Sequence, residues 1–334
     1  MIQTSLEKMF GVSPKKVVSS ASSLRVIDLF CGAGGFSTGA VQAGATVLYA
    51  NDMDEDALET HRRNHPDAIH SSDKLPSTKI PFPTDGAPFH LHGSPPCQKF
   101  SSFNVGRNAK RKQGDREHAE SLVEWFLMTA ISCGATSWSM EEVGSKHVVA
   151  IVEKFRKEHR SIVDFDVFEL QDFGVPQTRT RLIAGNPELI QRLRRAREEY
   201  LRLSVKDVIS NPRGTHIKNT RTTSSRVKRA RPQAGEAKYI YKKARLDEGC
   251  HPISSFSPTV IASTKNMWVT IEEGNAHSKL QLNVSEAAAL QTFPRAYKWP
   301  SKSTLATKQI GNAVPPLVAE LLLAGKLGED NFSI

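Results

Sequence analysis

The stretch Leu24–Gly35 reads LRVIDLFCGAGG, and it decides the fold. Its first seven residues are mostly apolar and end at a glycine cluster, which predicts a short buried strand. Glycines directly after a strand permit a tight turn and let a ligand approach the backbone closely. Phe36–Ala43 has the composition of the helix that follows. This pattern fits a nucleoside cofactor, although a simple packing turn between strand and helix would look similar.

The same alternation of strand and helix continues along the chain. We expect helices at 55–64, 117–132 and 146–160, and further strands at 46–50, 88–92, 136–140, 164–170 and 181–184. Strands that alternate with helices predict a doubly wound, mostly parallel α/β sheet. Ligands of such sheets bind at the carboxyl ends of the strands. Asp28, Asp52, Cys97 and Glu141 all fall at these ends, so we expect the site there.

The character of the chain changes after Asn186. Residues 205–280 lack sustained periodicity, are basic and carry scattered Gly, Pro, Ser and Thr, which indicates a separate, smaller, loop-rich domain. Helical periodicity returns at 285–290 and 314–323. We therefore expect a flexible segment at 1–22, a large domain formed by 23–186 and 283–334, and a small domain at 187–282.

Charge and cysteine content restrict the class of protein. The 334 residues carry a formal net charge of +10. Residues 201–250 hold 13 Lys/Arg against 4 Asp/Glu, and 99–112 hold five basic residues and no acid, so a polyanion partner is expected. The four cysteines show no CxxC spacing, which favours reduced thiols in an intracellular protein over a disulfide framework or a metal site. Neither a membrane span nor a secretory signal is expected.

The hexapeptide Gly93–Gln98, GSPPCQ, is the strongest candidate for chemistry. Its two prolines fix φ and remove two backbone donors, so the turn is stiff. A stiff turn at a strand end holds the Cys97 thiol in one place, as a nucleophile needs. The alternative is a proline-rich turn that merely contains a cysteine.

Three further side chains can be assigned candidate roles. Asp52, at the end of the second strand, is placed to accept hydrogen bonds from a ribose diol. Glu141, after the strand at 136–140, is a candidate acid catalyst. Arg179 and Arg181 alternate in sequence, so on an extended segment they share a face and could bind a base edge, a phosphate or Glu141.

Taken together, these residues resemble the DNA (cytosine-5)-methyltransferase family. Six blocks match the family in its order, and they extend from residue 25 to about 325: DLFCGAGGFS at 28–37, GSPPCQ at 93–98, EEV at 141–143, QTRTR at 177–181, EAAALQTFP at 286–294 and QIGNAVPP at 309–316. Two positions depart from the family pattern. Glu142 stands where Asn is usual, and Met53 stands where an aromatic ring often follows the ribose-binding acid.

The resemblance implies a Rossmann-like, S-adenosylmethionine-dependent methyltransferase domain. It implies that Cys97 is the nucleophile, that Glu141 contacts the N3 edge of cytosine and that Arg179 clamps the base, with Arg181 also in the catalytic group. The implied cofactor-binding residues are Phe30, Gly32, Gly34, Gly35, Asp52, Met53, Asp73, Pro96 and Asn312. Residues 187–282 would form the target recognition domain of a monomer acting on double-stranded DNA without a metal.

The implied reaction is methylation of C5 of a flipped-out cytosine through a covalent bond between Cys97 and C6. One alternative is a transfer-RNA cytosine-5 methyltransferase, although none of the four cysteines is followed by the Phe-Thr typical of that branch. A second is a catalytically inactive DNA-binding relative, which the intact Cys97, Glu141 and Arg179 disfavour. A dinucleotide-dependent enzyme is disfavoured because Ser37 stands where G-x-G-x-x-G needs glycine. The target sequence and the role, in restriction–modification or elsewhere, stay open.

Overall fold

The structure, a computed structural model, describes residues 24–96, 109–209, 215–216, 239–242, 250–262, 267–273 and 276–324. These residues form two compact units. We call them the seven-stranded unit, formed by residues within 24–169, 180–199 and 314–324, and the five-stranded unit, formed by residues within 170–179 and 200–313. No helix among the described residues is long and apolar enough to cross a membrane.

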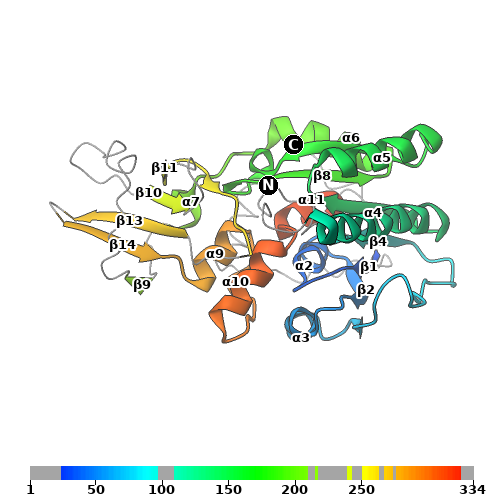
Figure 1. The fold of residues 1–334 in the computed structure, drawn as a ribbon, viewed down its shortest axis with the longest axis horizontal. Coiled ribbons are helices and arrows are strands. Elements are labelled where there is room, and N and C mark those ends of the chain that lie inside the picture. Colours follow the sequence, from blue (N-terminus) through cyan, green and yellow to red (C-terminus); the bar gives the residue numbers. More distant parts are fainter. Residues whose placement is uncertain are drawn as a thin grey trace. The chain divides into compact units, whose positions relative to one another are not determined.

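The seven-stranded unit contains the sheet predicted from the sequence (Figure 1). Its strand order is β3-β2-β1-β4-β5-β8-β6. The strands are β1 (Arg25–Leu29), β2 (Thr46–Asn51), β3 (Ile69–Ser71), β4 (Phe89–Gly93), β5 (Ser137–Glu142), β6 (Asp164–Glu169) and β8 (Thr180–Gly185). The first five strands in this order are parallel, and β8 runs antiparallel to both β5 and β6. The doubly wound, mostly parallel sheet is therefore confirmed.

The order of the strands also locates the expected ligand crevice. From β1, the chain builds outward to β2 and β3 on one side, and then to β4 and β5 on the other. Such a reversal is the switch point at which open α/β sheets bind ligands, beyond the carboxyl ends of the strands. The glycine turn follows β1 and the turn that begins at Ser94 follows β4, so both border this point.

Helices complete the seven-stranded unit. They are α2 (Gly35–Gln42), α3 (Glu55–Asn64), α4 (Ala109–Ser132), α5 (Lys146–Glu158), α6 (Pro187–Glu199) and α11 (Pro316–Ala324). Buried residues of α4 and α5, such as Phe126 and Val152, join the strand residues Leu91, Trp138 and Met140 in one core. The sequence analysis did not predict α6.

Helices α2 and α11 pack with their backbones in contact, although the sequence separates them widely. A Cβ added at Gly39 would lie 2.0 Å from the carbonyl oxygen of Pro316. Only glycine permits this approach. The contact holds the last described helix against the helix that follows the glycine turn.

The five-stranded unit is built on an antiparallel sheet of order β11-β10-β13-β14-β9. Its strands are β9 (Thr215–His216), β10 (Tyr239–Lys242), β11 (Cys250–Pro252), β13 (Met267–Glu273) and β14 (Ala276–Gln281). The sequence analysis did not predict these strands, because it found no sustained periodicity at 205–280. Their signal is local: 267–273 reads MWVTIEE, with β-branched and aromatic residues, and Gly274-Asn275 follows as a hairpin-type dipeptide.

The remaining elements of the five-stranded unit surround a second core. They are η1 (Leu170–Phe173), β7 (Gln177–Thr178), which pairs with β12 (Ser257–Pro258), and the helices α7 (Val205–Val208), α9 (Val284–Leu290) and α10 (Ser303–Asn312). The buried side chains include Val205, Val260, Leu290 and Ile310. The compact units thus differ from the domains expected at 187–282 and 283–334, because α6 groups with the large sheet and α9 and α10 with the small one. Which segments recognise DNA stays a prediction.

Candidate active site

The glycine turn after β1 leaves space beside its backbone. Phe30, Gly32 and Gly34 all have positive φ angles of 57°, 53° and 91°. Glycine tolerates this conformation, whereas Phe30 is held in it at a cost. A Cβ built on Gly32 would meet no atom of the described part of the chain within 4 Å, so with respect to these residues this face of the turn is open to a ligand.

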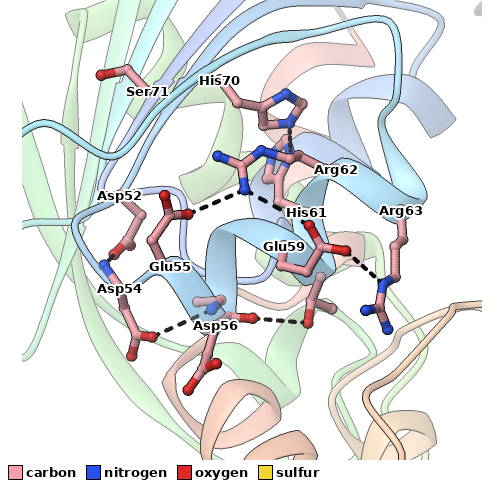
Figure 2. Close-up of polar contacts among 12 residues, drawn as sticks. Asp52, Asp54, Glu55, Asp56, Glu59, His61, Arg62, Arg63, His70 and Ser71 are labelled. Carbon is pink, nitrogen blue, oxygen red and sulfur yellow. Dashed lines mark hydrogen bonds and ion pairs between the residues drawn. The ribbon is translucent and has the colours of Figure 1, made fainter.

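Asp52 connects the glycine turn to helix α3. One carboxylate oxygen accepts a hydrogen bond from the Gly32 N–H at 2.8 Å, and the other accepts one from the Asp54 N–H at 2.8 Å. Asp54 in turn caps α3 through its side chain, which accepts from the Ala57 N–H (Figure 2). The carboxylate is therefore fixed in orientation. The neighbouring Met53 is 67% exposed.

Asp73 lies close to this group through the adjacent strand. The Asp52 N–H donates to the Ser71 carbonyl, and the buried Asn51 side chain donates to the carbonyls of both Ser71 and Asp73. The Ser71 hydroxyl donates to the Asp73 carboxylate at 2.9 Å. The ends of β1, β2 and β3 therefore bring Gly32, Asp52 and Asp73 to one edge of the sheet.

A buried polar chain lies behind the glycine turn. The Ser37 hydroxyl donates to Asp28 at 2.6 Å, His61 Nε2 lies 3.0 Å from the same hydroxyl, and His61 Nδ1 lies 2.8 Å from His70 Nε2. Burial raises the pKa of Asp28 to about 7. Burial also lowers the pKa of His61 well below its usual value, so this ring is neutral. Figure 2 shows the contact between His61 and His70 beside Arg62.

Glu141 and Arg181 form an ion pair on adjacent strands. The sequence analysis placed Glu141 after a strand ending at residue 140. Strand β5 instead continues through Glu142, so both glutamates lie within the strand. Glu141 Oε1 is 2.8 Å from Arg181 Nε, and the two side chains are 10% and 14% exposed. Arg181 thus places its positive charge directly beside the Glu141 carboxylate.

Glu142 points into a different environment from Glu141. It is 1% exposed, and one carboxyl oxygen accepts from the Val143 N–H. Burial, reinforced by the charge of Glu141, raises the pKa of Glu142 well above its usual value. Burial therefore disfavours a second negative charge beside Glu141 at the position where the family has Asn.

Arg179 has a different set of partners from Arg181. It is 2% exposed, and its guanidinium donates to the carbonyl oxygens of Val260, Gly311 and Ala313 at 3.1, 3.3 and 3.1 Å. All of these residues belong to the five-stranded unit, as does Asn312, the last residue of α10. Arg179 therefore links its own segment with two others that are distant in the sequence, one at Val260 and one at 311–313.

Cys97 and the basic residues from Lys99 to Arg107 lie outside the described residues. The chain is described as far as Pro96, which is exposed. Of the described thiols, Cys31 is buried and Cys133 is half-buried, and burial raises the pKa of both. Among the residues that the structure describes, no group of three or more His, Cys, Asp or Glu side chains is arranged to hold a metal ion.

Sequence reasoning missed one residue at this site, His92. It is fully buried on β4 and hydrogen-bonded to Ser94, which begins the turn leading to Cys97. A signal was present, because two histidines alternate in the apolar strand FHLHG at 89–93, where a buried strand normally carries apolar side chains.

Comparison with known proteins agrees with this geometry. The chain is 44% identical over 165 residues to the type II methyltransferase M.AgeI of Thalassovita gelatinovora, a match covering 48% of this chain and 38% of that protein. It is 28% identical over 334 residues to the type II methyltransferase M1.HphI of Haemophilus parahaemolyticus, covering 90% of this chain and 86% of that protein.

A solved structure and a family model cover most of the chain. The structure of a putative DNA modification methyltransferase encoded within an E. coli prophage matches with a TM-score of 0.60 and 21% identity, covering 91% of this chain and 98% of that one, which shows a shared fold. The model of C-5 cytosine-specific DNA methylases matches residues 24–119 and 140–326. This chain therefore belongs to the C-5 cytosine-specific DNA methylase family, and it is a DNA (cytosine-5)-methyltransferase.

Proposed function

We propose that this enzyme methylates C5 of a cytosine flipped out of duplex DNA, using Cys97 as the nucleophile and Glu141, oriented by Arg181, as the group that contacts N3. The observation that carries the proposal is the Glu141–Arg181 ion pair on β5 and β8. Strands β1, β2, β4 and β5 are parallel, so the glycine turn, Asp52, Ser94 and the Glu141 end of β5 belong to the same edge of one sheet.

The residues after β1 and β2 fit S-adenosylmethionine. The open face at Gly32 admits a ligand against the backbone of Phe30–Gly35, and the fixed Asp52 carboxylate can accept hydrogen bonds from a ribose diol. The exposed Met53 offers an apolar surface for an adenine ring, with Asp73 nearby. We include Pro96 and Asn312 in this set on the resemblance alone. When bound, the cofactor supplies an electrophilic methyl group.

We assign the nucleophile to Cys97 rather than to Cys31 or Cys133. Attack requires a thiolate, and burial raises the pKa of Cys31 and of Cys133. Cys97 follows two prolines directly after β4, beside the switch point of the sheet. The position suits an attacking group for a base bound at that edge.

The side chains then act in sequence. The Cys97 thiolate adds to C6 of cytosine, and the electron pair of the C5–C6 bond moves towards C5 and the N3 edge. Glu141 stabilises the developing charge at N3 by a hydrogen bond or a proton, while Arg181 keeps its carboxyl group in place. Once C5 carries its methyl group, loss of the C5 proton restores the double bond and expels Cys97.

Phosphate contacts come from the basic segments at 99–112 and 201–250, and base readout from 187–282. We propose that Arg179 stabilises the five-stranded unit rather than clamping the base, because its guanidinium already donates hydrogen bonds to three carbonyl oxygens. The relatives M.AgeI and M1.HphI are type II methyltransferases, so we assign the enzyme, as a monomer, to an intracellular restriction–modification system.

Product analysis tests the proposal. The purified chain is incubated with S-adenosylmethionine and either duplex DNA or transfer RNA, and the digested nucleosides are identified by mass spectrometry. We expect 5-methylcytosine in DNA and none in transfer RNA. N4-methylcytosine or N6-methyladenine would refute the mechanism, since methylation of an amino group needs no thiol, and methylated transfer RNA alone would favour the alternative substrate.

A further inference from the structure

A row of hydrogen bonds crosses the buried part of strands β4 and β5. His92 pairs with Ser139 in the sheet register, and His90 pairs with Ser137. His90 lies 2.8 Å from the Ser137 hydroxyl and 2.9 Å from that of Ser139. His92 Nδ1 lies 2.8 Å from the same Ser139 hydroxyl. All four side chains are at most 1% exposed.

The row ends at the turn that leads to Cys97. His92 Nε2 lies 3.0 Å from the Ser94 hydroxyl, and Ser94 is the first residue after β4. The other ring nitrogen of His92, Nδ1, contacts the Ser139 hydroxyl. Ser139 lies two residues before Glu141, so both side chains are on the same face of β5. One imidazole therefore connects the start of the Cys97 turn to the strand that carries Glu141.

The His92 ring is also fixed by stacking. Its centroid lies 3.5 Å from that of Phe36, with an interplanar angle of 3°. Phe36 belongs to α2, the helix that follows the glycine turn. His92 thus touches the elements that hold the glycine turn, the Cys97 turn and Glu141, all within the seven-stranded unit.

A neutral, ordered row satisfies all of these hydrogen bonds. A neutral imidazole has one donor and one acceptor, and each hydroxyl donates once. If the His92 Nδ1–H donates to Ser139, then His92 Nε2 accepts from Ser94; in the reverse order, the His92 Nε2–H donates to Ser94. Either direction leaves the bond to Ser94 intact. Burial lowers the pKa of His92 well below its usual value, which keeps the ring neutral.

Ser94 controls the direction of the turn because the next two residues cannot. Pro95 and Pro96 have no N–H and a fixed φ, so they add stiffness but no backbone donor with which to attach the turn. Ser94 is attached twice, through its N–H to the Leu29 carbonyl at 3.2 Å and through its hydroxyl to His92. Because proline fixes φ, few rotatable backbone bonds remain between Ser94 and the end of Pro96.

We propose that His92 is a positioning residue for methyl transfer, whose bond to Ser94 sets the direction of the turn that carries Cys97. The inference rests on the proposed role of Cys97. A displacement of about 1 Å of a reacting group can cost about 100-fold in rate. His92 does not touch the reacting atoms, so its loss should slow the chemical step without weakening the binding of either substrate.

The test compares His92→Phe with a matched control, His90→Phe. Both replace a buried histidine of the same strand with a ring of similar size, but only His92 contacts Ser94. We expect His92→Phe to lower the single-turnover rate at saturating S-adenosylmethionine and duplex DNA at least tenfold, with both dissociation constants within about twofold of wild type. His90→Phe should keep the rate within about twofold. His92→Gln, which can still reach Ser94, should recover part of the rate.

Ser94→Ala removes the hydroxyl that is hydrogen-bonded to His92, at a position that is partly exposed. This variant provides the test if His92→Phe does not fold. We expect it to slow the same step at least tenfold, and the double variant with His92→Phe to lose nothing more. Equal losses in His92→Phe and His90→Phe, additive losses in the double variant, or a wild-type rate in Ser94→Ala would each overturn the inference. An active Cys97→Ser in the same assay would instead overturn the proposed function.

Discussion

Glu141 Oε1 lies 2.8 Å from Nε of Arg181, whereas Arg179, two residues earlier, donates to three backbone carbonyls and is 2% exposed. The sequence motif QTRTR makes these two arginines look alike. Their partners assign them different tasks. Arg181 pairs with the carboxylate that we propose contacts the base, and Arg179 links segments of the five-stranded unit.

The two arginines should therefore fail in different ways. Arg181→Ala should lower the single-turnover rate by about 100-fold, because Glu141 loses the group that orients it. Arg179→Met should instead lower the free energy of unfolding by about 3 kcal/mol, because three buried carbonyls lose their donor. Single-turnover kinetics and urea denaturation of both variants check this. The assignment fails if Arg179→Met is as stable as wild type and has lost the chemical step.

Covalent trapping tests the nucleophile. A fluorine at C5 cannot leave as a cation, so DNA with 5-fluorocytosine at the target should hold the enzyme covalently when S-adenosylmethionine is present. Cys97→Ser should abolish the complex, since a hydroxyl is far less ionised than a thiol near neutral pH. Denaturing electrophoresis measures it, with Cys133→Ser as the control that still traps. A complex that survives in Cys97→Ser would exclude the mechanism.

Asp52 should determine cofactor affinity rather than turnover. Both oxygens of Asp52 accept hydrogen bonds from backbone N–H groups, so Asp52→Asn places an amide N–H₂ against one of those donors. The substitution also removes the negative charge that we expect to accept hydrogen bonds from a ribose. We expect the dissociation constant for S-adenosylmethionine to rise about tenfold or more, with the turnover number nearly unchanged. Calorimetric titration measures the first. Asp67→Asn, an exposed change of the same charge, is the control and should bind as wild type does.

The buried Asp28 should make stability depend on pH. Its pKa is raised from 3.8 to about 7 by burial, so the folded protein keeps a proton that the unfolded chain has released between these values. The stabilisation is therefore complete below pH 3.8 and is lost as the pH rises to about 7. The shift of about three pKa units corresponds to at most about 4 kcal/mol.

Comparison with Asp28→Asn isolates this contribution, because other buried groups titrate equally in both proteins. We expect the difference in free energy of unfolding, wild type minus variant, to fall between pH 4 and pH 7 and then to level off. Denaturant titrations at five or six pH values suffice. A difference that stays constant, or grows with pH, would show that Asp28 is ionised throughout the folded state.

Several features were predictable from sequence because they depend on neighbouring residues. The apolar run before Cys31, the glycines after it and the helix from Gly35 to Gln42 are local, and the structure has them where they were expected. The parallel order of the sheet follows from the alternation of strand and helix, since parallel strands need crossover connections. The blocks that match the family were likewise visible in the sequence.

Other features depend on residues far apart in the chain, which no local pattern contains. Arg179 bonds to residues 81, 132 and 134 positions away, so only the folded chain separates its role from that of Arg181. In the five-stranded sheet, β13 carries a local signal, whereas the pairing of β9 with β14 joins segments that are far apart in the sequence.

Sequence alone thus determined the sheet and the glycine turn, and it predicts the reacting groups, because strand and turn propensities and motif spacing act over a few residues. Only the tertiary structure decided which arginine faces Glu141, that Glu142 is buried with a raised pKa, and that His92 contacts Ser94. The physical reason is that burial and hydrogen-bond partners are properties of packing, and packing here joins strands and helices that are distant in sequence.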